Sequence, residues 1–200
     1  TGLPHPAARE VTEHHETDWR KVSGWLTGEV PSGKTIFYQK HMAHHLLPEV
    51  ERDWLGELTH AFLIRDPAEM LLSLSKVTPS PRLEDTGLPQ QAELVDRIIQ
   101  EKGKAPPVLD ARDVLGDPPH FLDLLCREVG VEFDEAMLSW DPGRRDTDGV
   151  WASHWYGAVE ASTGWHPYEE KEVVLPESLR SLHEACMPFF NRLYGLRLGA

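Results

Sequence analysis

An arginine stands between an apolar run and a helix-forming run in the segment FLIRDPAEMLLSLSK, residues 62–76. The apolar run is typical of a buried strand, and Asp66 and Pro67 are residue types preferred at the start of a helix. A guanidinium beside the amides of a helix start forms an anion site, because it binds phosphate oxygens in a fork. Ser73, eight residues after Arg65, would add a hydroxyl if the helix bends back. The competing interpretation is structural, with Arg65 paired to a nearby carboxylate.

Three histidines gather in HMAHH, residues 41–45, just after the strand-like run Thr35–Tyr38. Open α/β sheets bind ligands at the carboxyl ends of their strands. A histidine there suits a general base, because imidazole titrates near neutral pH and can take a proton from a hydroxyl. His41 and His45 have the spacing of a helical metal site, but no third ligand is obvious, so we expect no metal. It is equally open that one or two of them, His44 included, cap a helix or face solvent.

Residues 28–35, GEVPSGKT, fit the phosphate-loop pattern G-x-x-x-x-G-K-[ST]. That loop needs a buried strand before it and a helix after it, so that backbone amides and the helix dipole point at phosphate. Here the preceding KVSGWLT is helical in pattern and the following residues are strand-like, which is the reverse order. A Pro-Ser-Gly turn is the favoured interpretation. A nucleotide kinase or hydrolase that uses this loop with ATP and magnesium is the least favoured function.

Helices that alternate with short strands predict an α/β fold with a parallel sheet. The predicted strands are Thr35–Tyr38, Thr59–Ile64 and Pro107–Leu109, and the predicted helices are 18–26, 44–58, 66–77, 90–101, 117–129, 151–162 and 176–194. A parallel sheet needs both faces covered and normally holds more than three strands. We therefore expect one domain over residues 1–200 that is incomplete on its N-terminal side.

The chain is acidic, with 33 Asp and Glu against 20 Lys and Arg and a formal net charge of −13. This charge argues against broad binding to nucleic acid or anionic membranes. No apolar run approaches the roughly 18 to 20 residues of a membrane span, and the N-terminus lacks the profile of a secretory signal. Cys126 and Cys186 have no flanking ligands, which predicts neither a disulfide framework nor a zinc knuckle. We expect a cytoplasmic protein.

Two further groups have the types to bind a ligand but are better explained structurally. Trp151, Trp155 and Tyr156 form an aromatic stripe at helical spacing, for which a core position is favoured over the lining of an acceptor pocket. Arg144 and Arg145 lie in a turn-rich stretch, where a solvated loop is favoured over a contact with sulfate or phosphate.

The strand–Arg–Asp–Pro–helix unit, with a serine eight positions after the arginine, resembles the 3′-phosphate-binding motif of sulfotransferases. Residues 107–140, PVLDARDVLGDPPHFLDLLCREVGVEFDEAMLSW, are similar to the later strand, acidic turn and Asp-Pro helix of that family. YQKHMAHHL, LEDTGLPQQ, DGVWASHWYGAV and STGW resemble phrases of bacterial sulfotransferase-like proteins, some labelled as related to branched-chain aminotransferases. The matches run in order from about residue 35 to residue 165.

The resemblance implies a three-layer parallel-sheet fold of the P-loop nucleoside triphosphate hydrolase type, with a helical C-terminal half. It also implies transfer of a sulfuryl group from 3′-phosphoadenylyl sulfate (PAPS) to a hydroxyl or amine of a small molecule, leaving 3′,5′-phosphoadenosine (PAP). Arg65 and Ser73 would hold the 3′-phosphate of this co-substrate. Lys40 would stabilise the leaving phosphate, and His41 or His44 would be the base. No metal is required.

Two features of sulfotransferases are not found in the sequence. The strand and short loop that grip the 5′-phosphosulfate would lie before residue 1 or within residues 1–30, where no such unit is recognisable. The C-terminal Arg-Lys-Gly loop of the better-known cytosolic members is absent from FFNRLYGLRLGA. The alternative function is therefore a truncated or non-catalytic relative that binds a ligand or an interaction partner.

Overall fold

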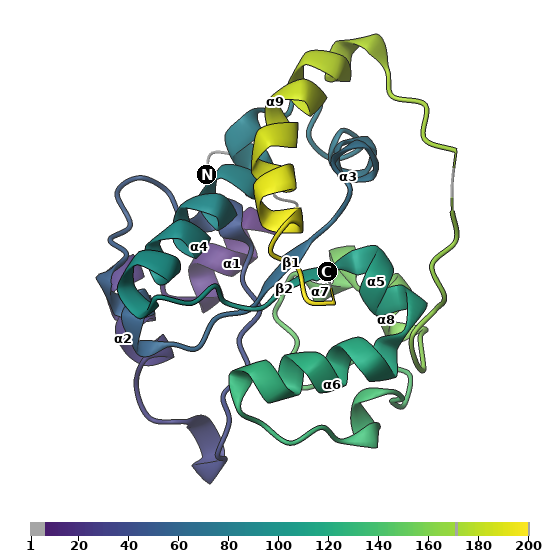
Figure 1. Cartoon of the computed structure of the whole chain (residues 1–200). Coiled ribbons are helices and arrows are strands. Elements are labelled where there is room, and N and C mark those ends of the chain that lie inside the picture. The colour runs from purple at the N-terminus through teal and green to yellow at the C-terminus, as the bar shows by residue number, and fades with distance from the viewer. Residues whose placement is uncertain (1–6, 171, 200) are drawn as a thin grey trace. The chain divides into compact units, whose positions relative to one another are not determined.

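The structure, a computed structural model, describes residues 7–170 and 172–199 (Figure 1). The helices are α1 (Ala8–His14), α2 (Trp19–Leu26), α3 (Pro67–Leu74), α4 (Leu88–Lys102), α5 (Ala111–Gly116), α6 (Pro118–Val129), α7 (Ala152–Trp155), α8 (Gly157–Glu160) and α9 (Glu177–Tyr194). The strands are β1 (Phe62–Ile64) and β2 (Val108–Asp110), and short 3-10 turns occupy Pro31–Gly33, Ala43–His45, Asp53–Glu57, Leu83–Thr86 and Glu135–Met137. This mixture of helices and strands confirms the predicted α/β class.

Contacts divide the chain into two compact units, each built from two stretches of sequence. The first unit runs to Thr59 and includes Asp141–Thr163, whereas the second comprises His60–Trp140 and the chain from Gly164 onward. The second unit contains both strands and also Arg65, which lies between β1 and α3. No helix in the described part of the chain is long and apolar enough to cross a membrane.

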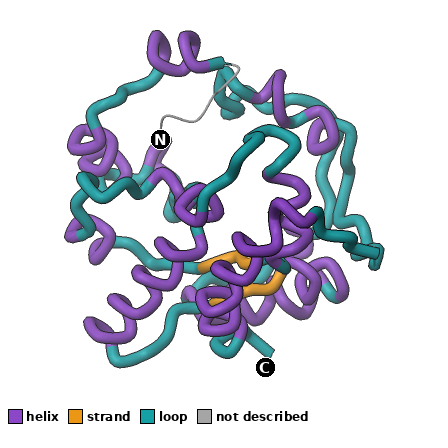
Figure 2. Tube along the Cα trace, turned by 90° about the horizontal axis from the view of Figure 1, so that it is seen from above, coloured by secondary structure: helices purple, strands orange, loops and turns teal. Residues whose placement is uncertain are grey.

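The sheet of the second unit is small and parallel. β1 pairs with β2 so that Ile64 lies opposite Asp110, and Figure 2 shows the two strands side by side among helices. A parallel pair needs a crossover between its strands, and α3 and α4 supply it here. Beyond α9, Arg197 forms a parallel bridge with Val108, and the amide of Leu198 donates to the Val108 carbonyl at 2.8 Å. The chain after α9 thus adds a short third stretch beside β2.

The core of this unit lies between the strands and the helices α3, α4 and α9. α9 contacts both strands as well as α3 and α4, and Figure 1 shows it beside the strands. The largest fully buried side chains of this core are Ile64, Pro67, Leu71, Val95, Val108, Cys186 and Leu193. All three residues of β2 are buried, whereas β1 alternates buried and exposed positions. β2 is therefore covered on both faces, whereas β1 is covered on one face.

The local signals at helix ends are confirmed in this unit. The Asp66 side chain caps α3 and Pro67 occupies its first turn, while Gly130, with φ at 75°, ends α6. α5 lies outside the predicted elements and follows β2 directly. It starts there because the Asp110 carboxylate accepts a hydrogen bond from the Arg112 amide at 2.8 Å, which is the geometry of an N-cap.

In the first unit, the predicted strand Thr35–Tyr38 is wrong. These residues form no strand, and the Tyr38 side chain is 82% exposed. Strand propensity expresses how well a side chain fits a half-buried sheet, and this segment pairs with no neighbouring strand. Side chains fasten it instead: the Phe37 ring packs edge-on against Trp25, and the Gln39 amide donates to the Leu26 carbonyl at 2.8 Å.

The predicted helix 44–58 is also wrong, because only the 3-10 turns Ala43–His45 and Asp53–Glu57 form there. Pro48 lacks an amide hydrogen and disfavours the interior of a helix, so apolar spacing alone does not make this segment helical. The predicted helix 151–162 is interrupted at Tyr156 and forms the short helices α7 and α8. The helix predicted over 18–26 is confirmed as α2, with Asp18 as its N-cap.

Residues 28–35 form a turn, as predicted. They follow the helix α2, and Ser32 and Gly33 have positive φ values of 59° and 63° within the turn Pro31–Gly33. The chain that follows is neither strand nor helix. The amides of this stretch therefore do not meet the start of a helix, which a phosphate loop requires.

Candidate functional site

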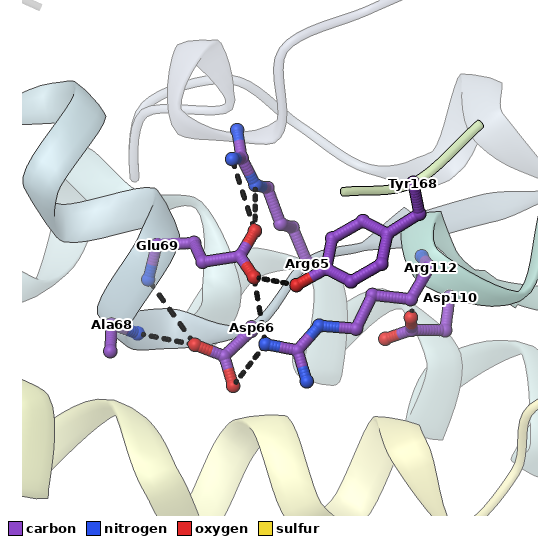
Figure 3. Close-up of polar contacts among 7 residues, drawn as sticks. All are labelled: Arg65, Asp66, Ala68, Glu69, Asp110, Arg112 and Tyr168. Atoms are coloured by element: carbon purple, nitrogen blue, oxygen red, sulfur yellow. Dashed lines mark hydrogen bonds and ion pairs between the residues drawn. The ribbon is translucent and has the colours of Figure 1, made fainter. Parts of the chain in front are cut away.

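Arg65 lies at the carboxyl end of β1, and α3 begins two residues later (Figure 3). Its Nε and Nη2 atoms both lie 3.1 Å from Oε2 of Glu69, one turn into α3. The Arg65 side chain remains 51% exposed, whereas Glu69 is only 8% exposed. No hydrogen bond to the described residues engages Nη1 of Arg65. Arg65 therefore forms the ion pair with a nearby carboxylate that was one of the two interpretations of the sequence. About half of its side chain is still exposed to solvent.

The amides at the start of α3 are not free, which corrects the expected contribution of backbone amides to an anion site. Oδ1 of Asp66 accepts hydrogen bonds from the amides of Ala68 at 3.0 Å and of Glu69 at 3.2 Å. A capping carboxylate takes the place that a phosphate oxygen would occupy at an uncapped helix start. An anion bound at this junction therefore depends on side-chain donors.

Ser73 lies on α3 four residues after Glu69, so helical geometry puts both on one face of the helix. Ser73 is exposed, and its hydroxyl makes no hydrogen bond within the described part of the chain. Glu69, the partner of Arg65, and Ser73 are therefore neighbours along one face of α3.

A second arginine, Arg112, reaches the same carboxylate and was not identified from the sequence. It follows β2 by two residues, and its Nη2 donates to Oε1 of Glu69 at 2.8 Å and lies 3.3 Å from Oδ2 of Asp66. The parallel register of β1 and β2 brings the ends of both strands to one edge of the sheet. The sequence does hold a signal for Arg112, because this arginine follows a predicted strand closely, as Arg65 does.

Tyr168 supplies a third donor from the segment before α9. Its hydroxyl donates to Oε1 of Glu69, and its ring centroid lies 5.3 Å from the Arg112 guanidinium (Figure 3). The start of this segment is fastened separately, because Trp165 donates from Nε1 to the Met137 carbonyl at 3.0 Å. Tyr168 is 99 positions from Glu69, so no local spacing in the sequence indicated the contact.

The donors around Glu69 determine its charge. Burial raises the pKa of this carboxyl, but hydrogen bonds from Tyr168, Arg112 and Arg65 outweigh burial and lower the pKa to about 2. The same hydrogen bonds to Glu69 raise the pKa of Arg112 and of Tyr168. Burial raises the pKa of Asp110 nearby. Glu69 is therefore ionised at neutral pH and carries a fixed negative charge beside two arginines.

Lys40 and His41 lie in the first unit, on the chain before the turn Ala43–His45. Lys40 is exposed, and its ammonium lies 3.0 Å from the sulfur of Met42, a weak acceptor. Nε2 of His41 lies 3.2 Å from the side-chain oxygen of Gln39. Neither residue is at the end of a strand, contrary to the prediction.

The rings of His44 and His45 pack edge to face with centroids 4.4 Å apart. Because this stretch is a 3-10 turn rather than an α-helix, His41 and His45 do not share a helical face. Among the residues described, no group of three His, Cys, Asp or Glu side chains could hold a metal ion.

A family model described as a sulfotransferase domain matches residues 1–196 of the chain. The chain belongs to the sulfotransferase domain family. The resemblance inferred from the sequence motifs is therefore confirmed.

Two curated relatives match almost all of this sulfotransferase domain. It is 30% identical over 194 residues to branched-chain-amino-acid aminotransferase-like protein 2 of Arabidopsis thaliana, and 31% identical over 194 residues to branched-chain-amino-acid aminotransferase-like protein 1 of the same plant. Each match covers 96% of this chain and 34% of the relative, so the chain spans about a third of the length of these relatives. No solved structure matches the chain.

The aromatic stripe of the sulfotransferase domain is not a core element, which corrects the prediction. Trp155 is 45% exposed, and of the helix α7 only Ala152 is buried. Trp151 is partly covered, with its ring 5.1 Å from that of His15 and its Nε1 3.5 Å from the Tyr156 hydroxyl. Because α7 has a single turn, it cannot bury a continuous stripe.

The loop that carries Arg144 and Arg145 is solvent-exposed, as predicted. The Arg145 amide donates to the Asp148 carboxylate at 2.8 Å, and its guanidinium donates to the Asp141 carbonyl. These contacts close the loop on itself.

Proposed function

We propose that this sulfotransferase domain transfers a sulfuryl group from PAPS to a hydroxyl or amine of a small molecule. Family membership supports the class of reaction. The observation that carries the co-substrate assignment is the half-exposed guanidinium of Arg65, which pairs with Glu69 on the face of α3 that also bears the hydroxyl of the exposed Ser73. These are donor types that bind a phosphate, and we assign them to the 3′-phosphate of PAPS.

The transfer itself requires a base and a cation, which we assign to His41 or His44 and to Lys40. The acceptor oxygen or nitrogen attacks sulfur, a new bond to sulfur forms, and the bond from sulfur to the 5′-phosphate oxygen breaks. The electron pair of the broken bond stays on PAP, and the acceptor proton passes to His44 or His41. Lys40 stabilises the charge on the leaving oxygen, since its ammonium is exposed and its hydrogen-bond contact is with a thioether, a weak acceptor.

We also propose that the domain has the three-layer P-loop architecture of sulfotransferases. The parallel pair β1 and β2, its helical crossover and the third parallel stretch at Arg197 support this assignment. In such sheets, ligands bind at the carboxyl edge of the strands, which is where Arg65 and Arg112 lie.

The co-substrate assignment is tested by titrating the domain with PAP in a calorimeter, with ATP and magnesium as the comparison. We expect selective binding of PAP and a loss of about tenfold to a hundredfold in affinity in Arg65→Ala, because charge-assisted hydrogen bonds contribute roughly 1.5–3 kcal/mol. Arg127→Ala is the matched control, since Arg127 also forms an i, i+4 ion pair, with Asp123 on α6. Unchanged PAP affinity in Arg65→Ala would refute the assignment.

A second candidate function is ligand binding without transfer. It is favoured by the described part of residues 1–30, which forms the helices α1 and α2 and no strand followed by a phosphate-binding loop. Incubation of the domain with PAPS and a set of phenols and amines separates the two functions, because only the enzyme produces PAP and a sulfated product. The aminotransferase part of the relatives' names supports no proposal, since the chain spans a third of their length.

A further inference from the structure

Glu69 is a buried carboxylate whose two oxygens have different partners. Oε2 accepts from Arg65 at 3.1 Å, while Oε1 accepts from Arg112 at 2.8 Å and from the Tyr168 hydroxyl. A carboxylate held on one oxygen by donors from two other segments cannot rotate freely. The oxygen that faces Arg65 is therefore set by Arg112 and Tyr168.

This arrangement fixes which donors Arg65 presents to solvent. Its Nε and Nη2 atoms are both engaged by the same oxygen of Glu69 at 3.1 Å. The guanidinium is planar, so holding that edge also holds the direction of Nη1 and of the outer hydrogen on Nη2. A donor set that is ordered before a ligand arrives loses less entropy on binding.

The charges of the cluster make this orientation important. The positive charges of Arg65 and Arg112 are balanced by the carboxylates of Asp66 and Glu69, with which they form ion pairs. Such a cluster attracts an anion only weakly through its net charge. Recognition of a phosphate at this place therefore depends on donors that point in the right direction.

We propose that Glu69 is a positioning residue for phosphate recognition, one that orients Arg65 toward the 3′-phosphate and is itself held by Arg112 and Tyr168. This inference rests on the proposed function, and it gives a role to three residues that the sequence motif left without one. Glu69 acts through Arg65 and does not touch the ligand. Tyr168 extends the site to the segment before α9 (Figure 3).

The test compares two ligands that differ only in the 3′-phosphate, namely PAP and adenosine 5′-phosphate. Glu69→Gln keeps the size of the side chain but removes its charge and turns one oxygen into a donor. We expect its PAP affinity to fall about tenfold while its affinity for adenosine 5′-phosphate stays the same. Asp123→Asn is the matched control, because Asp123 holds Arg127 through both Nε and Nη2 on α6. We expect it to bind both ligands as the wild type does.

Equal or tighter PAP binding by Glu69→Gln would overturn the positioning role, and so would an equal loss for both ligands, which a merely structural residue produces. If Glu69→Gln does not fold, Tyr168→Phe tests the positioning role of Glu69 instead. A loss confined to PAP supports the inference, and unchanged binding of PAP overturns it. Failure of the proposed function looks different: the wild type would then show no preference for PAP, or Arg65→Ala would leave that preference intact.

Discussion

The Glu69 carboxylate collects donors from three places that are distant in the chain. Arg65 follows β1, Arg112 lies on α5, and Tyr168 belongs to the segment before α9. A buried carboxylate is costly unless it is paired and hydrogen-bonded, and each of these donors offsets part of that cost. At the scale of single residues, Glu69 therefore links the candidate phosphate site to the stability of the fold.

The lowered pKa of Glu69 predicts how stability depends on pH. A carboxyl whose pKa is lower in the folded state stabilises the protein above its unfolded pKa, and this contribution is lost as pH falls through the folded pKa. With a folded pKa of about 2, the contribution is complete at pH 5–7 and declines below about pH 4.5. We expect the difference in unfolding free energy between wild type and Glu69→Gln, measured with urea, to shrink over that range. A difference that stays constant down to pH 3 would contradict the pKa shift, and other titrating groups cancel because both proteins contain them.

If His41 or His44 is the base, its substitution should lower the rate of sulfuryl transfer and leave the affinity for PAP unchanged. His44→Ala should reduce sulfuryl transfer to a model phenol by about a hundredfold or more, because it removes a proton acceptor, while PAP affinity stays unchanged. His41→Ala should show the same effect if His41 is the base instead. His120→Ala, an exposed histidine on α6, serves as the control. Full activity in both His41→Ala and His44→Ala would exclude these residues as the base.

At the scale of elements, helix ends are set by local chemistry. Asp66 caps α3, Asp117 caps α6, and Gly130 ends α6 in the left-handed region. Because the Asp66 cap sets where α3 begins, it also sets where Arg65 and Ser73 lie relative to that helix. The apolar pattern alone was less reliable, as the segment 44–58 shows.

Gly130 allows a clean test of a helix end. A Cβ at this position would meet no atom within 4 Å, so Gly130→Ala changes only the backbone preference at φ 75°. We expect a loss of about 1 kcal/mol in unfolding free energy, because an L residue is strained in this conformation. Gly116→Ala is the control, since Gly116 lies in α5 without a positive φ and also has no neighbour within 4 Å. An equal effect of both substitutions would argue against a left-handed cap at Gly130.

At the scale of the whole molecule, the end of the chain completes the second unit. α9 packs on both strands, and the residues after it pair with β2 at Val108. Arg197 reinforces this pairing through its Nε, 3.2 Å from Asp113, and through the Tyr194 ring beneath its guanidinium. The short strands β1 and β2 thus depend on packing against a segment that is distant from both of them in the sequence.

Leu193 tests this dependence. Its side chain is fully buried on α9, so Leu193→Ala should lower the unfolding free energy by about 2–5 kcal/mol through lost burial and a cavity. Val174→Ala, at a side chain 73% exposed in the same unit, should change it by no more than about 0.5 kcal/mol. Urea unfolding measures both. A Leu193→Ala loss as small as that of Val174→Ala would show that α9 does not support the core.

Much of the local structure could be predicted from the sequence. The strands near residues 62–64 and 108–110, most of the longer helices and the turn in residues 28–35 follow from patterns within a few positions. The predicted strand Thr35–Tyr38 failed because a strand requires a partner, which no local pattern specifies. The exposed position of Trp155 was missed for a similar reason, since burial depends on what packs against a helix.

By itself the sequence determined the helix caps, the arginine after β1 and the membership of the sulfotransferase family, because these depend on residue types in a fixed order along the chain. The tertiary structure alone decided that Arg112 and Tyr168 join Arg65 at Glu69. These contacts bridge 43 and 99 positions of sequence. They form because the parallel pairing of β1 with β2 and the path of the chain before α9 bring the side chains together, and that packing is a property of the folded chain.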